Sequence, residues 1–202
     1  MLFGDVVNEV SESERDPIPN GLDRYLGLDH IEPEYLFIER WGSLRDDEVS
    51  FTKRFRKGQV LFVKRRAYQR KTAVAEFDGI CSGDILAFEP LGDRLIPELL
   101  PFIVQSNRFL DHALGTSSGS LSPRTRWSQL RDFEFVLPSV DKQNEMAKLL
   151  WAQENQIRSL RKARNACDVA RKSLIAHLFQ HGTSLEKTQK TCLLYTSPSP
   201  RD

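Results

Sequence analysis

Residues 64–71, Lys-Arg-Arg-Ala-Tyr-Gln-Arg-Lys, place five cations, one amide and one phenol in eight consecutive positions. Arginine and glutamine side chains can hydrogen-bond to base edges in the major groove of DNA, while lysine mainly binds phosphates. Tyr68 adds an aromatic face and a hydroxyl group. The run follows an apolar stretch and therefore predicts a DNA-contacting loop, with a charged hairpin edge that deters aggregation as the alternative.

A second polar stretch, residues 116–126, combines serines, glycine and two arginines. Backbone amides of a Gly/Ser loop can approach a phosphate closely, and arginines at alternating positions of an extended segment point the same way. The alternative is a flexible surface connection, with Trp127 packed into the core in either case. The candidate DNA-binding residues are therefore Lys64, Arg65, Arg66, Tyr68, Gln69, Arg70, Lys71, Ser117, Ser118, Ser120, Arg124 and Arg126.

Other motifs argue against catalysis. Residues 115–119 match the G-x-S-x-G pattern of hydrolases, but that pattern needs a preceding strand and a following helix, and here a helix is expected to precede it. His177 and His181 stand one helical turn apart without a further ligand at metal-binding spacing. Asp84 and Glu89 flank a predicted strand without the lysine that a nuclease would need. No phosphate-binding loop for ATP is present, so we expect no catalytic residue, no metal site and no cofactor.

A long helical pattern covers residues 139–182 and follows the part of the chain that contains both loops. Steps of four and three residues from Met146 meet seven apolar positions among ten, interrupted by Gln153, Arg164 and Arg171. These polar residues either fix the register with a partner or lie at its margin with their charges in water. We call the apolar positions the seam, and predict that they pair with a partner helix: Met146, Leu150, Ile157, Leu160, Cys167, Leu174 and Leu178.

The first 138 residues read as an α+β domain. Short strands are expected at 25–28, 35–40, 49–55, 59–64, 73–77, 84–88 and 131–137, and helices near 97–104 and 107–114. Ser106 or Asn107 is expected to cap the second helix, and Gly115 to end it. The predicted organisation is a target-binding domain at 1–138, a long helix at 139–182, a polar linker at 183–191 and a tail at 192–202.

Composition narrows the class of protein. The net charge is only +1, but residues 1–50 hold thirteen acidic and four basic side chains, whereas residues 51–72 hold nine basic and none acidic. That asymmetry suggests one basic side, which suits a polyanion. Isolated cysteines predict a reducing compartment, and the absence of a long apolar run or a signal sequence predicts a cytoplasmic protein without a membrane span.

Several segments, in order, are similar to the specificity subunits of type I restriction-modification systems. They are residues 58–62, 66–71, 79–85 and 133–138, followed by a helix with Gln143, Ala147, Leu150, Ile157 and Arg164 and closed by residues 178–182. The resemblance implies a non-catalytic domain that recognises half of a split double-stranded DNA target, and a helix that sets the distance to the other half. It also implies methyltransferase and motor/nuclease subunits as partners, to which S-adenosylmethionine and ATP chemistry belong.

Members of that family carry two recognition domains and two antiparallel helices, whereas this chain has one of each. Either a second half is missing or two copies pair through the helix. Residues 192–202 resemble a translated sequencing adapter, which suggests that the native chain continues differently after Thr191. The alternatives are a coiled-coil scaffold whose head binds another protein, and the recognition region of a fused restriction-methylation enzyme.

Overall fold

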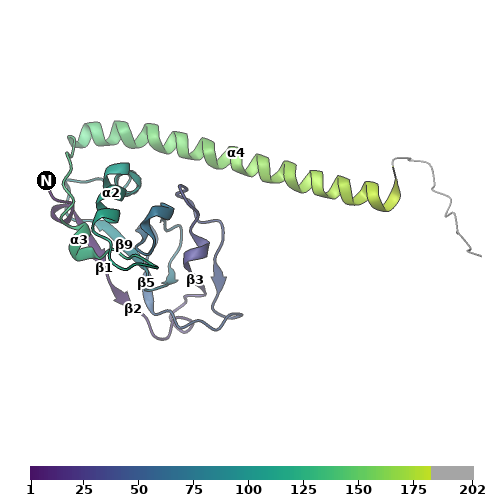
Figure 1. Ribbon diagram of the computed structural model, residues 1–202, viewed down its shortest axis with the longest axis horizontal. Coiled ribbons are helices and arrows are strands. Elements are labelled where there is room, and N and C mark those ends of the chain that lie inside the picture. Colours follow the sequence, from purple (N-terminus) through teal and green to yellow (C-terminus); the bar gives the residue numbers. More distant parts are fainter. Residues whose placement is uncertain (183–202) are drawn as a thin grey trace, which may run out of the picture. The chain divides into compact units, whose positions relative to one another are not determined.

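The computed structural model describes residues 1–182, which contacts divide into a globular unit, Met1–Asn155, and a second unit that begins at Gln156. The globular unit is a mixture of short helices and two small sheets, and the second unit is helical throughout its described part (Figure 1). The α+β fold class with a long helix at the end is therefore confirmed. No helix in the described residues is both long enough and apolar enough to cross a membrane.

The first sheet is the middle layer of the globular unit. Its antiparallel strands lie in the order β1 (Val7–Val10), β9 (Ile85–Pro90), β6 (Val60–Val63) and β7 (Thr72–Val74). All four residues of β6 are buried because the strand is covered on both faces. Val60 and Phe62 face a core built with the helices, whereas Leu61 and Val63 face a core shared with the second sheet.

The second sheet has the order β2 (Glu12–Ser13), β5 (Lys53–Phe55), β8 (Gly79–Cys81), β3 (Arg24–Leu26) and β4 (Gly42–Ser43), in which only β3 and β8 run parallel. Phe55, Leu26 and Cys81 bury their side chains against the first sheet. Gly79 is required here, because a Cβ atom would lie 2.7 Å from the carbonyl oxygen of Arg24 and 2.8 Å from the Phe55 ring.

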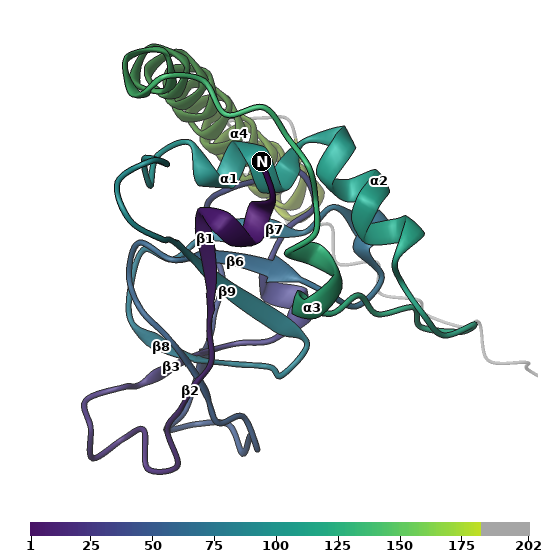
Figure 2. The ribbon, with the colours of Figure 1, turned by 90° about the vertical axis from the view of Figure 1, so that its left-hand side faces the viewer.

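Helices cover the other face of the first sheet (Figure 2). They are α1 (Leu100–Gln105), α2 (Asn107–Gly115) and α3 (Trp127–Leu130), with the 3₁₀ turn η1 (Phe3–Asp5) beside them. Phe3 sits at the centre of this core, with ring centroids 5.0 Å from Phe109, 5.7 Å from Phe88 and 6.0 Å from Trp127. Two further 3₁₀ turns, η2 (Leu28–His30) and η3 (Ala67–Gln69), lie in loops.

The long helix α4 runs over Val140–His181, as the sequence predicts. Its first turns belong to the globular unit. The side chain of Gln143, which is 0% exposed, accepts from the amide of Ile96 at 3.0 Å and donates to the carbonyls of Arg94 at 2.8 Å and Pro138 at 2.9 Å. Gly182 ends the helix in the left-handed conformation (φ 73°), and its amide donates to the carbonyl of Leu178.

Several expected elements differ in the structure. Residues 35–40 and 131–137 are not strands, although residues 35–38 and Phe133 are buried. The segment at 131–137 pairs only briefly with the first residues of the chain, through an isolated bridge between Leu2 and Glu134. Residues 35–40 are joined to β7 by a backbone hydrogen bond of 2.8 Å, from the amide of Val74 to the carbonyl of Leu36. The sequence missed β2, β4, β8 and α3, which are two to four residues long.

The helix-capping predictions are confirmed at α2. The Ser106 hydroxyl accepts from the amide of Phe109 at 3.3 Å, and the helix ends at Gly115. The predicted domain boundary at residue 138 lies two residues before the start of α4, whereas contacts keep α4 up to Asn155 with the globular unit. The predicted linker (183–191) and tail (192–202) lie outside the described residues.

Candidate nucleic-acid interface

The first basic loop, residues 64–71, connects β6 to β7 and has a fixed turn at its centre. Arg66 and Arg70 flank η3, and both adopt the left-handed conformation, with φ 56° and 55°. Amides of Gln69 and Arg70 donate to the carbonyls of Arg66 and Ala67 at 2.9 Å each. Ala67 is buried between them and anchors the turn in the helical core. The loop is therefore a compact hydrogen-bonded turn that buried Ala67 anchors to the globular unit.

The second loop, residues 117–126, leaves the C-terminus of α2. The hydroxyls of Thr116 and Ser117 donate to the carbonyls of His112 at 2.8 Å and Ala113 at 2.6 Å, which satisfies the end of that helix. Because a helix precedes this serine and its hydroxyl is used as a cap, the hydrolase pattern at 115–119 lacks the geometry of a nucleophile. Ser118 and Arg124 exchange two backbone hydrogen bonds of 3.0 Å, while Ser118 and Ser120 are exposed.

The structure brings the two predicted loops together. Arg65 forms a bridge with Arg124, the amide of Arg66 donates to the carbonyl of Pro123 at 2.8 Å, and the amide of Thr125 donates to that of Lys64 at 3.2 Å. We call residues 64–71 and 117–126 together the paired-loop surface. All twelve candidate DNA-binding residues, which the sequence treats as two separate groups, thus lie on one surface whose two loops are hydrogen-bonded to each other.

Asp84, which immediately precedes β9, contacts the paired-loop surface and was not among the predicted site residues. Its carboxylate accepts two hydrogen bonds from Arg124, from Nε at 2.9 Å and from Nη2 at 3.2 Å, and lies 3.9 Å from Nη1 of Arg65. Arg65 also donates to the hydroxyl of Ser122 at 3.2 Å. Hydrogen bonding to Asp84 raises the pKa of Arg124 above its usual value.

The other cations of the paired-loop surface divide into two groups. Arg70 contacts Glu34 at 2.7 Å and Asn107 at 2.6 Å, and Nζ of Lys71 donates to the carbonyl of Leu28 at 2.7 Å. In contrast, Lys64, Arg66 and Arg126 form no ion pair with any residue in the part of the chain that the structure describes. Unlike Arg70 and Lys71, these three have no side-chain hydrogen bond to another of the described residues, so they can bind a phosphate without first breaking one.

A depression of about 450 Å³ lies beside the basic loop. Arg65, Arg66, Gln69 and Lys71 line it together with residues 27–29, Phe51 and Ser82. Tyr68 lies outside it, with 55% of its surface exposed. The sequence did not indicate residues 27–29, because they are far from the basic run in the chain.

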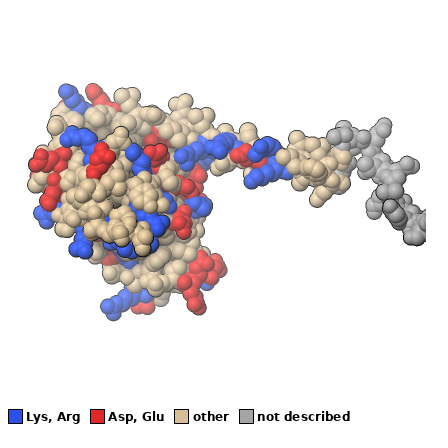
Figure 3. Space-filling model, viewed as in Figure 1, with Lys and Arg blue, Asp and Glu red and all other residues tan. Residues whose placement is uncertain are grey.

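Much of the charge asymmetry seen in the sequence is cancelled in the fold. Pairing of β2 with β5 brings basic side chains beside acidic ones from the N-terminal region: Lys53 lies 3.0 Å from Glu9, and Arg56 lies 2.9 Å from Glu12. Figure 3 shows basic and acidic side chains interspersed over the visible face of the globular unit. The expected broad basic side is thus reduced to the shorter run at 64–71.

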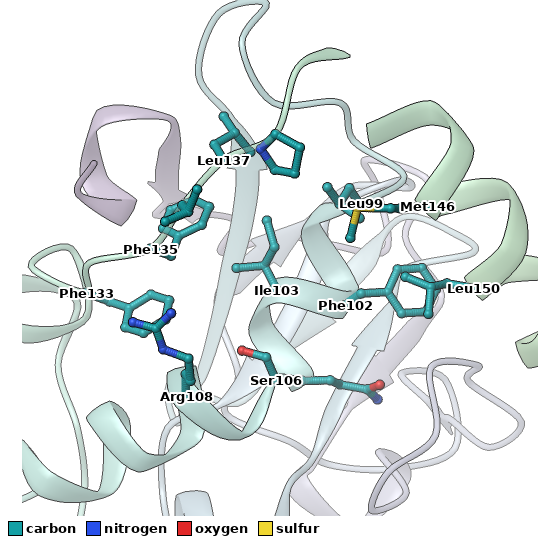
Figure 4. Close-up of a pocket in the computed structure, with 13 residues that line it drawn as sticks. Leu99, Phe102, Ile103, Ser106, Arg108, Phe133, Phe135, Leu137, Met146 and Leu150 are labelled. Carbon is teal, nitrogen blue, oxygen red and sulfur yellow. The ribbon is translucent and has the colours of Figure 1, made fainter. Parts of the chain in front are cut away.

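The seam residues fall in both units. Met146 and Leu150 lie in the globular unit, where they line an apolar pocket of about 470 Å³ with Leu99, Phe102 and Ile103 (Figure 4). Ile157 is half-buried, Leu160 is 66% exposed, and Cys167, Leu174 and Leu178 are exposed. Helix pairing by these residues stays a prediction.

Within residues 1–182 no group of three or more His, Cys, Asp or Glu side chains could hold a metal ion, and the side chain of His181 lies outside the description.

No protein-family model matches the chain. The Escherichia coli type I restriction enzyme EcoDI specificity subunit is 25% identical over 145 residues, which are 71% of this chain and 32% of that protein. The chain thus spans about a third of that curated relative.

Three solved structures have the same fold. A chain of a type I restriction-modification system, solved in a study of complex assembly and conformational transition, has a TM-score of 0.65 at 20% identity, covering 91% of this chain and 50% of its own. The HsdS subunit from Thermoanaerobacter tengcongensis has a TM-score of 0.64 at 20% identity (90% and 48%). The type I S subunit from M. genitalium has a TM-score of 0.58 at 15% identity (89% and 45%). The resemblance to the specificity subunits of type I restriction-modification systems is therefore confirmed, and the chain has the fold of about half of such a subunit.

Proposed function

We propose that this chain recognises one half of a bipartite double-stranded DNA target as part of a type I restriction-modification complex. The observation that carries the proposal is the paired-loop surface. Two loops about 60 residues apart are hydrogen-bonded into one structure that presents arginine, lysine, glutamine and tyrosine side chains. A charged hairpin edge alone would not need the second loop.

The side chains of the paired-loop surface divide by chemistry. Lys64, Arg66 and Arg126, which have no carboxylate partner among the described residues, are suited to phosphates. Arg124 and Gln69 have the donor and acceptor groups that recognise base edges. Exposed Tyr68 can pack on the sugar-phosphate backbone or on a base methyl group.

The proposal assigns catalysis to other subunits. The similar proteins are named specificity subunits, and one of the solved chains comes from an assembled type I system. In this chain the hydrolase-like serine serves as a helix cap and Asp84 is bound by arginines. We therefore assign DNA methylation to methyltransferase subunits and DNA translocation and cleavage to a motor/nuclease subunit.

The exposed apolar seam supports a second role in spacing. Leu160, Leu174 and Leu178 lie on α4 beyond the globular unit, and an apolar stripe on such a helix is stabilised by pairing with another helix. The partner helix belongs to a second copy of the chain or to the other half of a longer subunit. Its pairing would set the distance between the two DNA half-targets.

The test of DNA recognition is the salt dependence of binding to duplex DNA, measured by fluorescence anisotropy. Replacing Lys64, Arg66 and Arg126 with alanine should weaken binding and flatten the plot of log affinity against log salt by about 2.7, at about 0.9 per lost phosphate contact. The control replaces Arg15, Arg45 and Lys57, three exposed cations outside the surface, and removes the same charge.

Equal slopes for the parent and both triple variants would contradict the assigned DNA contacts. If the parent chain bound no duplex at low salt, the scaffold interpretation would replace DNA recognition. The exposed seam and the apolar pocket would then be the features that explain the activity.

A further inference from the structure

Arg124 is held through both its backbone and its side chain. Its backbone exchanges hydrogen bonds with Ser118 on one side and bridges Arg65 on the other. The ring of the preceding residue, Pro123, fixes its own φ angle, and the carbonyl of Pro123 accepts from the amide of Arg66 at 2.8 Å. The guanidinium group is then fixed by two hydrogen bonds to Asp84, whose side chain is only 18% exposed.

The contact with Asp84 uses one edge of the guanidinium and leaves another available. Nε–H and one N–H of Nη2 point to the carboxylate. The guanidinium carries five N–H donors in one plane, so three remain, and two of these, one on each Nη, point in parallel away from the side chain. Arg124 is 48% exposed, and these N–H groups have no hydrogen-bond partner within residues 1–182.

Two parallel donors on a fixed plane match the O6 and N7 acceptors that guanine presents in the major groove. A phosphate is a poorer match, because Asp84 has already compensated the charge of this arginine. We propose that Arg124, held in place by Asp84, recognises one guanine of the DNA half-target through O6 and N7; this inference rests on the proposed function. Asp84 is then a positioning residue, and Arg124 determines specificity at one base pair.

Arg124 and Arg126, two positions further along the chain, differ in how their side chains are restrained. Arg126 is exposed and has no carboxylate partner among the described residues, so its side chain is free to follow a phosphate. The two arginines therefore form a matched pair for experiment: same loop, same residue type, different restraint. Substitution of Arg126 should lower affinity for every sequence, whereas substitution of Arg124 should remove the preference for one base.

The experiment selects duplexes from a random-sequence library with the full chain and with Arg124→Gln, Arg126→Gln and Asp84→Asn, and sequences the bound DNA. The parent should enrich a half-target with at least one invariant guanine. Arg124→Gln should reduce discrimination at that position by about ten- to a hundredfold. Arg126→Gln should leave the base preference unchanged. Asp84→Asn should weaken the preference for guanine and strengthen non-specific binding, because one negative charge in contact with the surface is removed.

Opposite changes in specificity and non-specific affinity cannot arise from partial unfolding, which would lower both. A second measurement uses only the unmodified protein: replacing the selected guanine with 7-deazaguanine removes the N7 acceptor and should reduce affinity about tenfold. An unchanged affinity, a selected site without an invariant guanine, or a guanine preference that survives Arg124→Gln would overturn the inference while leaving DNA binding in place. A parent chain that binds no DNA would overturn the proposed function with it.

Discussion

Gln143 provides a direct test of how α4 is attached to the globular unit. Its buried amide group makes three hydrogen bonds, to Ile96, Arg94 and Pro138, and all of them are lost in Gln143→Ala. At about 1 kcal/mol net for each bond, the free energy of unfolding should fall by about 3 kcal/mol. The higher helix propensity of alanine offsets only a few tenths of a kcal/mol.

Urea denaturation is the appropriate assay, with far-UV circular dichroism and tryptophan fluorescence as independent probes. Trp151, eight residues after Gln143 on the same helix, is a useful reporter because its indole N–H donates to the carbonyl of Glu98 at 2.9 Å and its ring contacts Phe102. In thermal unfolding, a loss of about 3 kcal/mol corresponds to about 6–12 °C in Tm for a chain of this size.

The matched control is Gln156→Ala, the same substitution at an exposed position of α4. It should change the stability by less than about 0.5 kcal/mol. If Gln143→Ala cost no more than this control, the hydrogen bonds of Gln143 would not be what holds the start of the helix, and the apolar contacts of Ala147 and Leu150 would have to account for it.

Three further predictions concern assembly, the buried thiol and spacing. Leu160→Arg should abolish helix-mediated association in sedimentation experiments, because it places a charge in the seam. The control, Ser159→Arg at the neighbouring position, should not. Equal association of both variants would refute pairing through the seam. Burial raises the pKa of Cys81 from 9.0 to about 12, so the native state keeps a proton that the unfolded state releases, and the free energy of unfolding should fall as pH rises between those values. Cys81→Ala should weaken this pH dependence of the free energy of unfolding, and an equally strong dependence in the variant would contradict the prediction. Peptide mapping should also show Cys167, but not Cys81, alkylated in the native protein. Deleting residues 158–164, one heptad, should keep the remaining seam residues in phase and leave the recognised half-target unchanged. The helix should become shorter by about 10.5 Å, which corresponds to about three base pairs between the half-targets. Methylation mapping of the reconstituted system would detect the new spacing, and a changed half-target would refute the division of roles.

Structural features that depend on neighbouring residues could be predicted from the sequence, whereas features that depend on residues far apart in the chain could not. The bounds of α4 could be predicted because capping residues, apolar period and terminal glycine are all local signals. Strands β6 and β9 could be predicted for the same reason. Residues 131–137 alternate like a strand but lack a neighbour long enough to complete a ladder, and alternation alone does not reveal that.

The candidate site shows the same limit. Both loops could be found from their composition, but not the hydrogen bonds between them, since the relevant residues are about 60 positions apart. Asp84 was visible in the sequence as an acid beside a strand. Its role depends on Arg124, 40 residues further along, and only the fold places the two together.

The left-handed conformations of Arg66 and Arg70 have a consequence for engineering. Such a backbone costs an L-residue with a side chain about 1–2 kcal/mol, and glycine avoids that cost. A search for stabilising substitutions would therefore propose glycine at both positions, which are the positions that supply guanidinium groups to the paired-loop surface. Thermostability and affinity for a polyanion are opposed at these two residues, so a library selected only for heat resistance would be expected to lose binding first in this loop.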